Sequence, residues 1–172
     1  MISCVNAAGQ YLPSTLIYTK SLPTERYKNL IPQDWTLAWS NTGYITTKLF
    51  EQWFVQTFVP RCGATKEKPV LLIMDNCSTH YSRLVIETAI ENNIHLLCEP
   101  PNTSHLVQPL DKIFGPLKDE FNTLCYSSKV VDAHACINKG NMAVFVNKAQ
   151  ESTWSPSVVK SGWQRTGLHP LD

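Results

Sequence analysis

The sequence predicts an α/β protein, and three observations from the middle of the chain predict it. Residues 70–74 form a short, continuous apolar run, which is typical of a strand buried on both faces. Residues 82–92 have a helical pattern, and residues 94–98 form a second apolar run. A strand, helix, strand unit of this kind crosses over right-handedly between parallel strands. We therefore expect a sheet that contains a parallel pair and is covered by helices.

The part of the chain before this unit predicts further strands and one long helix. Residues 2–18 hold two apolar, β-prone runs around a turn at Gly9, which indicates an antiparallel hairpin. A third strand is expected at residues 36–40. Between residues 45 and 58 the apolar side chains recur at three and four positions, which is the spacing of a helix with one buried face.

The part after the unit is expected to be helical. An irregular loop follows the prolines at residues 100–101 and runs to Asp111, beyond which apolar residues recur in helical register. Because proline fits a helix only in the first turn, Pro116 predicts that this helix begins close behind Asp111.

The tail from Asp132 onward predicts helical pieces with a break at residues 140–141. Ser155 and Pro156 look like a cap followed by proline at the first helical position, and either Gly162 or Gly167 would close this last helix.

Composition and charge narrow the class of protein. With 172 residues, 43% hydrophobic and 17% charged, residues 1–172 are expected to form a single domain. No apolar run is long enough to cross a membrane, and the first residues lack the pattern of a secretory signal, so we expect an intracellular protein. A net charge of +1 does not by itself indicate a nucleic-acid partner.

The cysteines stand singly, without a pair at zinc-ligand spacing, so we expect reduced and mostly buried thiols rather than disulfides or structural zinc. They are Cys4, Cys62, Cys77, Cys98, Cys125 and Cys136.

Two aspartates are the candidate site residues. Asp75 follows the buried run at residues 70–74, at the edge of an open α/β sheet where ligands bind. Asp111 stands at the mouth of the helix after the proline-rich loop. Two carboxylates brought together there would bind a hard divalent cation, which prefers oxygen ligands. Taken singly, each aspartate is explained about equally well as a helix N-cap.

The sequence around both aspartates resembles the DDE endonuclease superfamily, in its pogo, Tigger and jerky branch of transposases. Residues 71–80, LLIMDNCSTH, look like the segment with the second catalytic aspartate, and residues 100–111, PPNTSHLVQPLD, look like the segment with the last acid. The spacing of 36 positions, from 75 to 111, suits that superfamily. Residues 5–13, 47–53 and 162–170 are similar to other parts of the family, so the resemblance covers nearly the whole chain.

This resemblance implies the fold, the chemistry and the partners. It implies an RNase H-like mixed sheet flanked by helices, with Mg²⁺ or Mn²⁺ as the cofactor. Asp75 and Asp111 would be catalytic residues and metal ligands. The implied activity is cleavage and joining of DNA at transposon ends in the nucleus, with no membrane partner; a homodimer is the assembly considered.

One element of the family pattern is missing. The first catalytic aspartate of this family lies on the first strand, just before the hairpin with which this chain begins, and no acidic residue precedes Glu25. Glu25 and Asp34 fall in a connecting loop and are not expected to substitute. We therefore expect a domain that is incomplete at its N-terminus, lacks the first strand and is inactive alone.

Side chains near the aspartates have less specific interpretations. Glu99 is expected to be solvated rather than a further ligand. His80 and His105 are expected to fix the turns around the aspartates by hydrogen bonds, with contact to metal or phosphate as the alternative. Lys112 and Lys118 are expected on a solvated helix face, with DNA phosphates as the alternative.

Three functions stay open at this point. The first is a transposase core in which Asp75 and Asp111 are the surviving ligands. The second is a domesticated, non-catalytic module that associates with DNA or with proteins, which the near-neutral charge and the missing acid favour. The third is a metal-dependent phosphohydrolase of another α/β family, against which the segment at residues 108–111 argues.

Overall fold

The strands form two separate sheets rather than one. The structure, a computed structural model, describes residues 1–24, 27, 30–131 and 137–171. Strand β1 (Thr15–Thr19) pairs in parallel with β2 (Thr36–Ser40), and β3 (Val70–Met74) pairs in parallel with β4 (Ile94–Cys98). The predicted positions of β2, β3 and β4 are confirmed, and so is the parallel pairing of β3 with β4.

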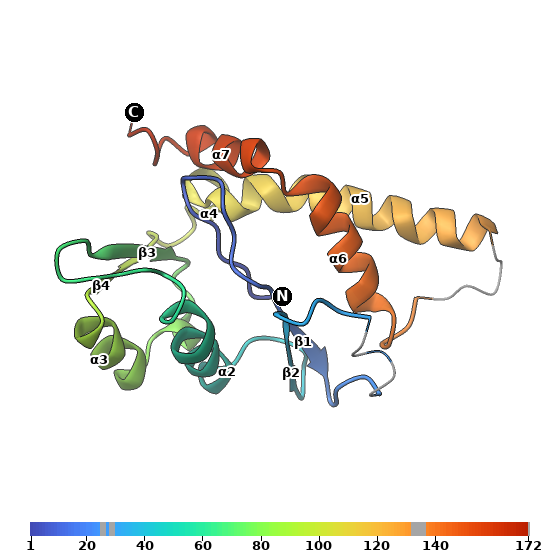
Figure 1. The fold of residues 1–172 in the computed structure, drawn as a ribbon, viewed down its shortest axis with the longest axis horizontal. Coiled ribbons are helices and arrows are strands. Elements are labelled where there is room, and N and C mark those ends of the chain that lie inside the picture. The colour runs from blue at the N-terminus through green and yellow to red at the C-terminus, as the bar shows by residue number, and fades with distance from the viewer. Residues whose placement is uncertain (25–26, 28–29, 132–136, 172) are drawn as a thin grey trace.

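The expected continuous mixed sheet is not present among the described residues, because the two sheets are separated by a cavity. This cavity has a volume of about 960 Å³, and its lining includes all of β3 on one side and Ile17 of β1 on the other. The N-terminal arm, residues 1–14, precedes β1. Figure 1 shows this arm running between the two pairs of strands. The arm folds back on itself through antiparallel bridges from Ile2 to Thr15 and from Val5 to Tyr11, as the predicted hairpin requires.

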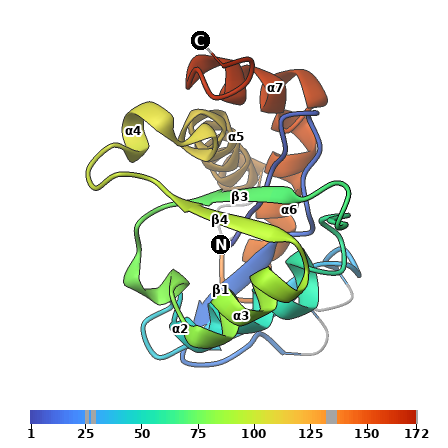
Figure 2. The ribbon, with the colours of Figure 1, turned by 90° about the vertical axis from the view of Figure 1, so that its left-hand side faces the viewer.

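Helices lie on both sides of the β3–β4 pair. Helix α2 (Thr47–Trp53), whose last turn widens into the π-helical η1 (Phe54–Phe58), and helix α3 (Arg83–Glu91) lie on one side. The short α4 (Ser104–Val107), the long α5 (Pro109–Val131) and α7 (Pro156–Arg165) lie on the other, as Figures 1 and 2 show. A single 3₁₀ turn, η2 (Ser78–His80), connects β3 to α3.

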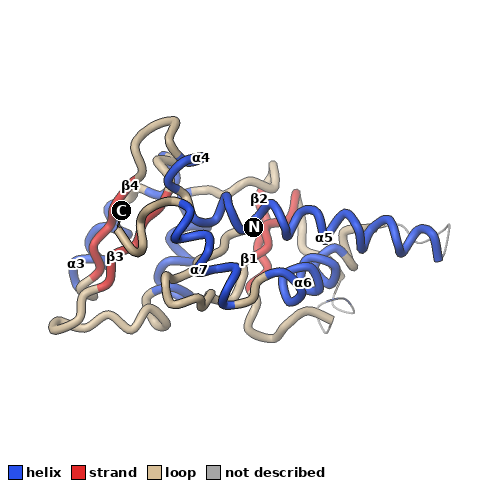
Figure 3. Tube along the Cα trace, turned by 90° about the horizontal axis from the view of Figure 1, so that it is seen from above, coloured by secondary structure: helices blue, strands red, loops and turns tan. Residues whose placement is uncertain are grey.

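Helix α5 begins earlier than predicted. It starts at Pro109, two positions before Asp111, so Pro116 lies inside the helix and not in its first turn. A proline inside a helix costs about 3 kcal/mol because it removes one hydrogen bond and crowds the preceding turn. Burial of Ile113 and Leu117 on either side of this point favours a continuous helix. Figure 3 shows α5 extending away from β3 and β4 next to α6 (Met142–Thr153).

The last helix has the predicted start and one of the two predicted ends. The Ser155 side chain caps α7 by accepting a hydrogen bond from the Val158 N–H, and Pro156 is its first residue. Gly167, with φ of 68°, follows the end of the helix, whereas Gly162 lies inside it. The predicted break at residues 140–141 directly precedes α6. Asp132 and Cys136 lie outside the described residues.

Three apolar clusters form the core. The first joins α2, η1 and α3 to β3 and β4, with Phe54 and Val85 fully buried. The second joins α5, α6 and α7 around Ile113 and Trp154. The third lies under β1, around Leu16. The first two clusters hold β3 and the start of α5, which carry the two candidate aspartates.

Candidate metal centre

Asp75 stands directly behind β3, at the carboxyl end of a parallel pair. Leu72 and Met74 of the strand are buried, and this burial anchors the strand end from which Asp75 emerges. The Cys77 N–H donates to Asp75 Oδ1 at 3.3 Å, which closes a short turn. The side chain of Asp75 is 43% exposed. Asp75 caps the turn that leads toward α3, whereas the N-cap of α3 itself is Ser82.

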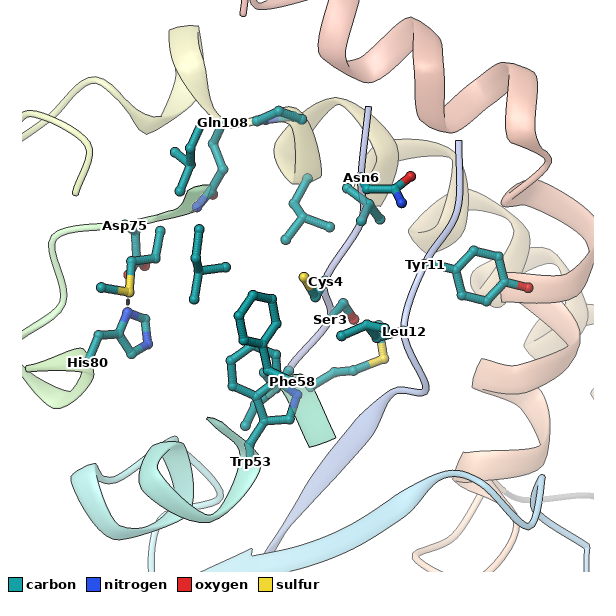
Figure 4. Close-up of a pocket in the computed structure, with 18 of the residues that line it drawn as sticks. Ser3, Cys4, Asn6, Tyr11, Leu12, Trp53, Phe58, Asp75, His80 and Gln108 are labelled. Carbon is teal, nitrogen blue, oxygen red and sulfur yellow. Dashed lines mark ion pairs between the residues drawn. The ribbon is translucent and has the colours of Figure 1, made fainter. Parts of the chain in front are cut away.

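His80 lies against Asp75. Its Nδ1 is 2.8 Å from Asp75 Oδ1, although the ring N–H is not aligned for a hydrogen bond. The imidazole is packed against the Phe50 ring at a centroid distance of 4.2 Å, so α2 holds it in place. Ligand atoms of Asp75, Cys77 and His80 all lie within 4.8 Å of one another. Figure 4 shows Asp75 and His80 facing each other at one end of the cavity.

Glu99 is buried, so the prediction of a solvated side chain is wrong. It follows β4 directly, its N–H donates to the Met74 carbonyl at 2.9 Å, and the residue is 4% exposed. Because β4 runs parallel to β3, the residue behind β4 is brought beside Asp75. Burial raises the pKa of the Glu99 carboxyl; a hydrogen bond from Ser104 lowers it, and the charges of Asp75 and Asp111 raise it again.

Asp111 is an exposed residue in the first turn of α5, where a negative charge is favoured by the helix dipole. It follows Pro109 and Leu110 in the helix, so it is not the N-cap. It does not belong to the group of ligand atoms within 4.8 Å of Asp75. The charges of both aspartates raise the pKa of the Glu99 carboxyl. Their joint role as metal ligands stays a prediction.

The loop before α5 is held by a lysine. Lys112 Nζ donates to the His105 carbonyl at 2.7 Å, which ties α4 to the first turn of α5. The contact therefore uses the backbone of His105, and the imidazole itself is exposed. Lys118 is exposed on α5, as expected.

The cavity between the two sheets opens onto this group of acids. Asp75, His80 and Glu99 line it together with Gln108. Figure 4 shows Asp75 and His80 on one side of the cavity and Cys4 of the N-terminal arm on the other. Neither Asp111 nor Asp34 is among the lining residues, and Glu25 lies outside the described residues. The exclusion of Asp34 from the site stays a prediction.

The donor atoms fit a divalent cation. Glu99 Oε2 is a buried carboxylate oxygen without a hydrogen-bond partner, and Asp75 offers a half-exposed carboxylate beside it. Hard cations such as Mg²⁺ and Mn²⁺ prefer oxygen ligands of this kind. The sequence identified Glu99 as a possible further ligand from its position directly behind a strand, the same signal that identified Asp75, but favoured a solvated side chain.

Comparisons with known proteins define the class. The model of the DDE superfamily endonuclease family matches residues 1–163, and the chain therefore belongs to this family. Tigger transposable element-derived protein 7 of Homo sapiens is 29% identical over 119 residues, which cover 63% of this chain and 22% of that protein. This similarity supports the Tigger branch that the motifs indicate.

A second curated relative matches almost the whole chain. The protein named MFS-type transporter clz9, from Cochliobolus lunatus, is 29% identical over 178 residues, which cover 99% of this chain and 19% of that protein. The chain thus spans about a fifth of the length of the curated relatives it matches. Within the described part of this chain, no helix is both long and apolar enough to cross a membrane. No solved structure matches the chain.

Proposed function

We propose that this chain is part of the DNA-cleaving and strand-transferring core of a pogo/Tigger-type transposase. The observation that carries the proposal is the position of the acid in each of the two family motifs. Asp75 lies at the carboxyl end of β3, and Asp111 lies in the first turn of α5. Membership in the DDE superfamily endonuclease family supports DNA as the substrate.

Asp75 and Asp111 are proposed as ligands of Mg²⁺ or Mn²⁺. When bound, such a cation would activate an attacking oxygen and stabilise the leaving oxygen in phosphoryl transfer. The chain's own contribution is positioning: the turn at Cys77 and the packing of His80 on Phe50 orient the Asp75 side of the site. The contact of Lys112 with the His105 carbonyl holds the first turn of α5, which carries Asp111.

We propose an RNase H-like sheet that is completed by one further strand in the cavity between β1 and β3. The cavity is lined by every residue of β3 and by apolar side chains of α2 and η1, such as Trp53 and Phe58, which suits a buried strand. In this family the strand at that place carries the first catalytic acid, and no acidic residue precedes Glu25 in this sequence. The chain as given is therefore proposed to be inactive alone.

The first test is Mn²⁺ binding to the purified chain, measured by calorimetry. Asp75→Asn and Asp111→Asn each remove one charged oxygen ligand, and each should weaken binding at least about tenfold. Asp34→Asn is the matched control, because Asp34 is exposed just before β2 and belongs to neither family motif. Binding that is unchanged in both site variants, or absent from the folded wild-type chain, would contradict the proposal.

The alternative function is a domesticated module that associates with DNA or proteins without catalysis. The net charge of +1 and the absence of acids before Glu25 favour it. The first proposal, a transposase core, also includes location in the nucleus, assembly as a homodimer and binding to transposon ends. Fluorescence anisotropy with duplex DNA, at 50 and 200 mM salt, distinguishes these cases. Salt-dependent binding that Mn²⁺ does not affect, in a chain that binds no metal, would favour the module.

A further inference from the structure

Glu99 has one buried carboxylate oxygen, Oε2, without a hydrogen-bond partner. In the described part of the chain, several buried side-chain oxygen and nitrogen atoms have no hydrogen-bond partner. Among these atoms, the one that belongs to a carboxylate is Glu99 Oε2. The residue is 4% exposed, so water does not replace the missing partner over most of its surface. A buried carboxylate without a partner is strongly unfavourable unless it is paired, neutralised or bound to a metal.

The charges around Glu99 have the same sign as its own. Asp75 and Asp111 both disfavour a negative charge on this carboxyl, and the Ser104 side chain is the one polar group that favours it. Within the described residues, no lysine or arginine forms an ion pair with Glu99. The buried carboxyl of Glu99 and the carboxyl of Asp75 therefore line one cavity without a lysine or arginine paired to Glu99, an arrangement that a bound cation would stabilise.

The backbone holds Glu99 beside Asp75. Met74 of β3 is paired with Cys98 of β4, so Asp75 and Glu99 are the next residues on neighbouring strands. The hydrogen bond from the Glu99 N–H to the Met74 carbonyl continues this pairing by one residue. Both side chains line the same cavity. Their relative position thus depends on the β3–β4 ladder and not on a loose loop.

We propose that Glu99 is a third carboxylate ligand of the divalent cation held by Asp75 and Asp111. The inference rests on the proposed function, because it requires a cation at those two aspartates. The further ligand, Glu99, comes from the end of β4. A cation bound there would gain a third charged oxygen and would remove the cost of burying Glu99.

The decisive variant is Glu99→Gln, which keeps the size of the side chain and removes its charge. Without metal, its melting temperature at pH 7.5 should rise above that of the wild type, because a buried charge among like charges is removed. With Mn²⁺, its affinity should fall at least about tenfold, as for Asp75→Asn. The upward shift in melting temperature on adding Mn²⁺ should shrink accordingly. Glu91→Gln, at an exposed position near the end of α3, is the control and should change neither quantity.

A second variant, Glu99→Asp, keeps the charge on a shorter side chain. It should restore part of the Mn²⁺ affinity that Glu99→Gln loses, and far-UV circular dichroism should show that both variants fold. If Glu99→Gln lowers the metal-free melting temperature and leaves Mn²⁺ affinity intact while Asp75→Asn weakens it, Glu99 is a structural residue. That result overturns the inference and leaves the proposed function standing. A folded wild-type chain that binds no Mn²⁺ overturns both.

Discussion

A buried hydrogen bond joins the N-terminal sheet to the C-terminal helices and allows a quantitative test of the fold. Ser14 Oγ donates to Gln150 Oε1 at 2.9 Å, across 136 positions of sequence. Ser14 is 0% exposed and Gln150 is 2% exposed, so water cannot replace either partner. Ser14 directly precedes β1, and Gln150 lies in α6, which packs on the helix that carries Asp111.

The double-mutant cycle Ser14→Ala, Gln150→Met has a defined expected result. Each single substitution leaves the other partner buried without a hydrogen bond and should lower the free energy of unfolding by about 1–3 kcal/mol. At the size of this chain, a loss of about 2 kcal/mol corresponds to a fall in melting temperature of about 4–8 °C. The double variant leaves neither polar atom unpaired, so it should lose about 1–2 kcal/mol less than the sum of the two single losses.

The assay is urea unfolding at 25 °C, followed by tryptophan fluorescence and by circular dichroism. The slope m should be equal in all four proteins, because the surface exposed on unfolding does not change. Losses that add to within about 0.3–0.5 kcal/mol would show that the two residues are not coupled. That result would contradict the placement of α6 against β1, even if each single variant is destabilised.

Three further predictions test the hairpin, the helical cluster and a thiol. Gly9→Ala should lower the free energy of unfolding by about 1–3 kcal/mol more than Gly63→Ala. Both glycines have positive φ, at 94° and 68°, but only at Gly9 would a Cβ lie 2.7 Å from the Pro156 carbonyl oxygen; equal losses in urea unfolding would contradict this packing. Ile113→Ala should cost about 2–5 kcal/mol, because the side chain is fully buried in the α5, α6 and α7 cluster, and a loss below about 1 kcal/mol would show a poorly packed site. Burial raises the pKa of Cys4 to about 12, so at pH 8 its thiolate is about a thousandfold scarcer than that of an ordinary thiol. Iodoacetamide labelling at pH 8, mapped by mass spectrometry, should therefore leave Cys4 as the slowest of the described cysteines. The buried, protonated thiol of Cys4 contributes to the free energy of unfolding. This contribution is complete below the ordinary thiol pKa and is lost as the pH rises toward 12. Labelling of Cys4 should therefore accelerate over that range.

The local pattern of the chain was sufficient for most elements. The apolar run at residues 70–74 and the segment at 94–98 were predicted as β3 and β4 at their observed bounds, and helical spacing predicted α2 with η1. Ser155 and Pro156 predicted the start of α7, because a cap and a proline at the first position act within one turn. These features depend on neighbours within a few positions, and the sequence contains that information directly.

The candidate site could be predicted only in part. Asp75 was placed by the strand before it, and the motif that ends at Asp111 identified the second acid. Glu99 was misjudged, because a glutamate behind a strand is usually solvated when nothing covers the strand end. Here Ser104 of α4 forms a hydrogen bond with the Glu99 carboxyl, and the residue is 4% exposed.

What the sequence alone determined is therefore the order and type of the elements, the two acid motifs and the family. Tertiary structure decided three points: the separation of the strands into two pairs, the continuation of α5 through Pro116, and the burial of Glu99. Each of these depends on contacts between segments that are distant along the chain, such as β1 with β2, α5 with α7, and β3 with β4. Strand pairing and burial at such contacts outweigh local preferences by a few kcal/mol, and no local pattern in the sequence records them.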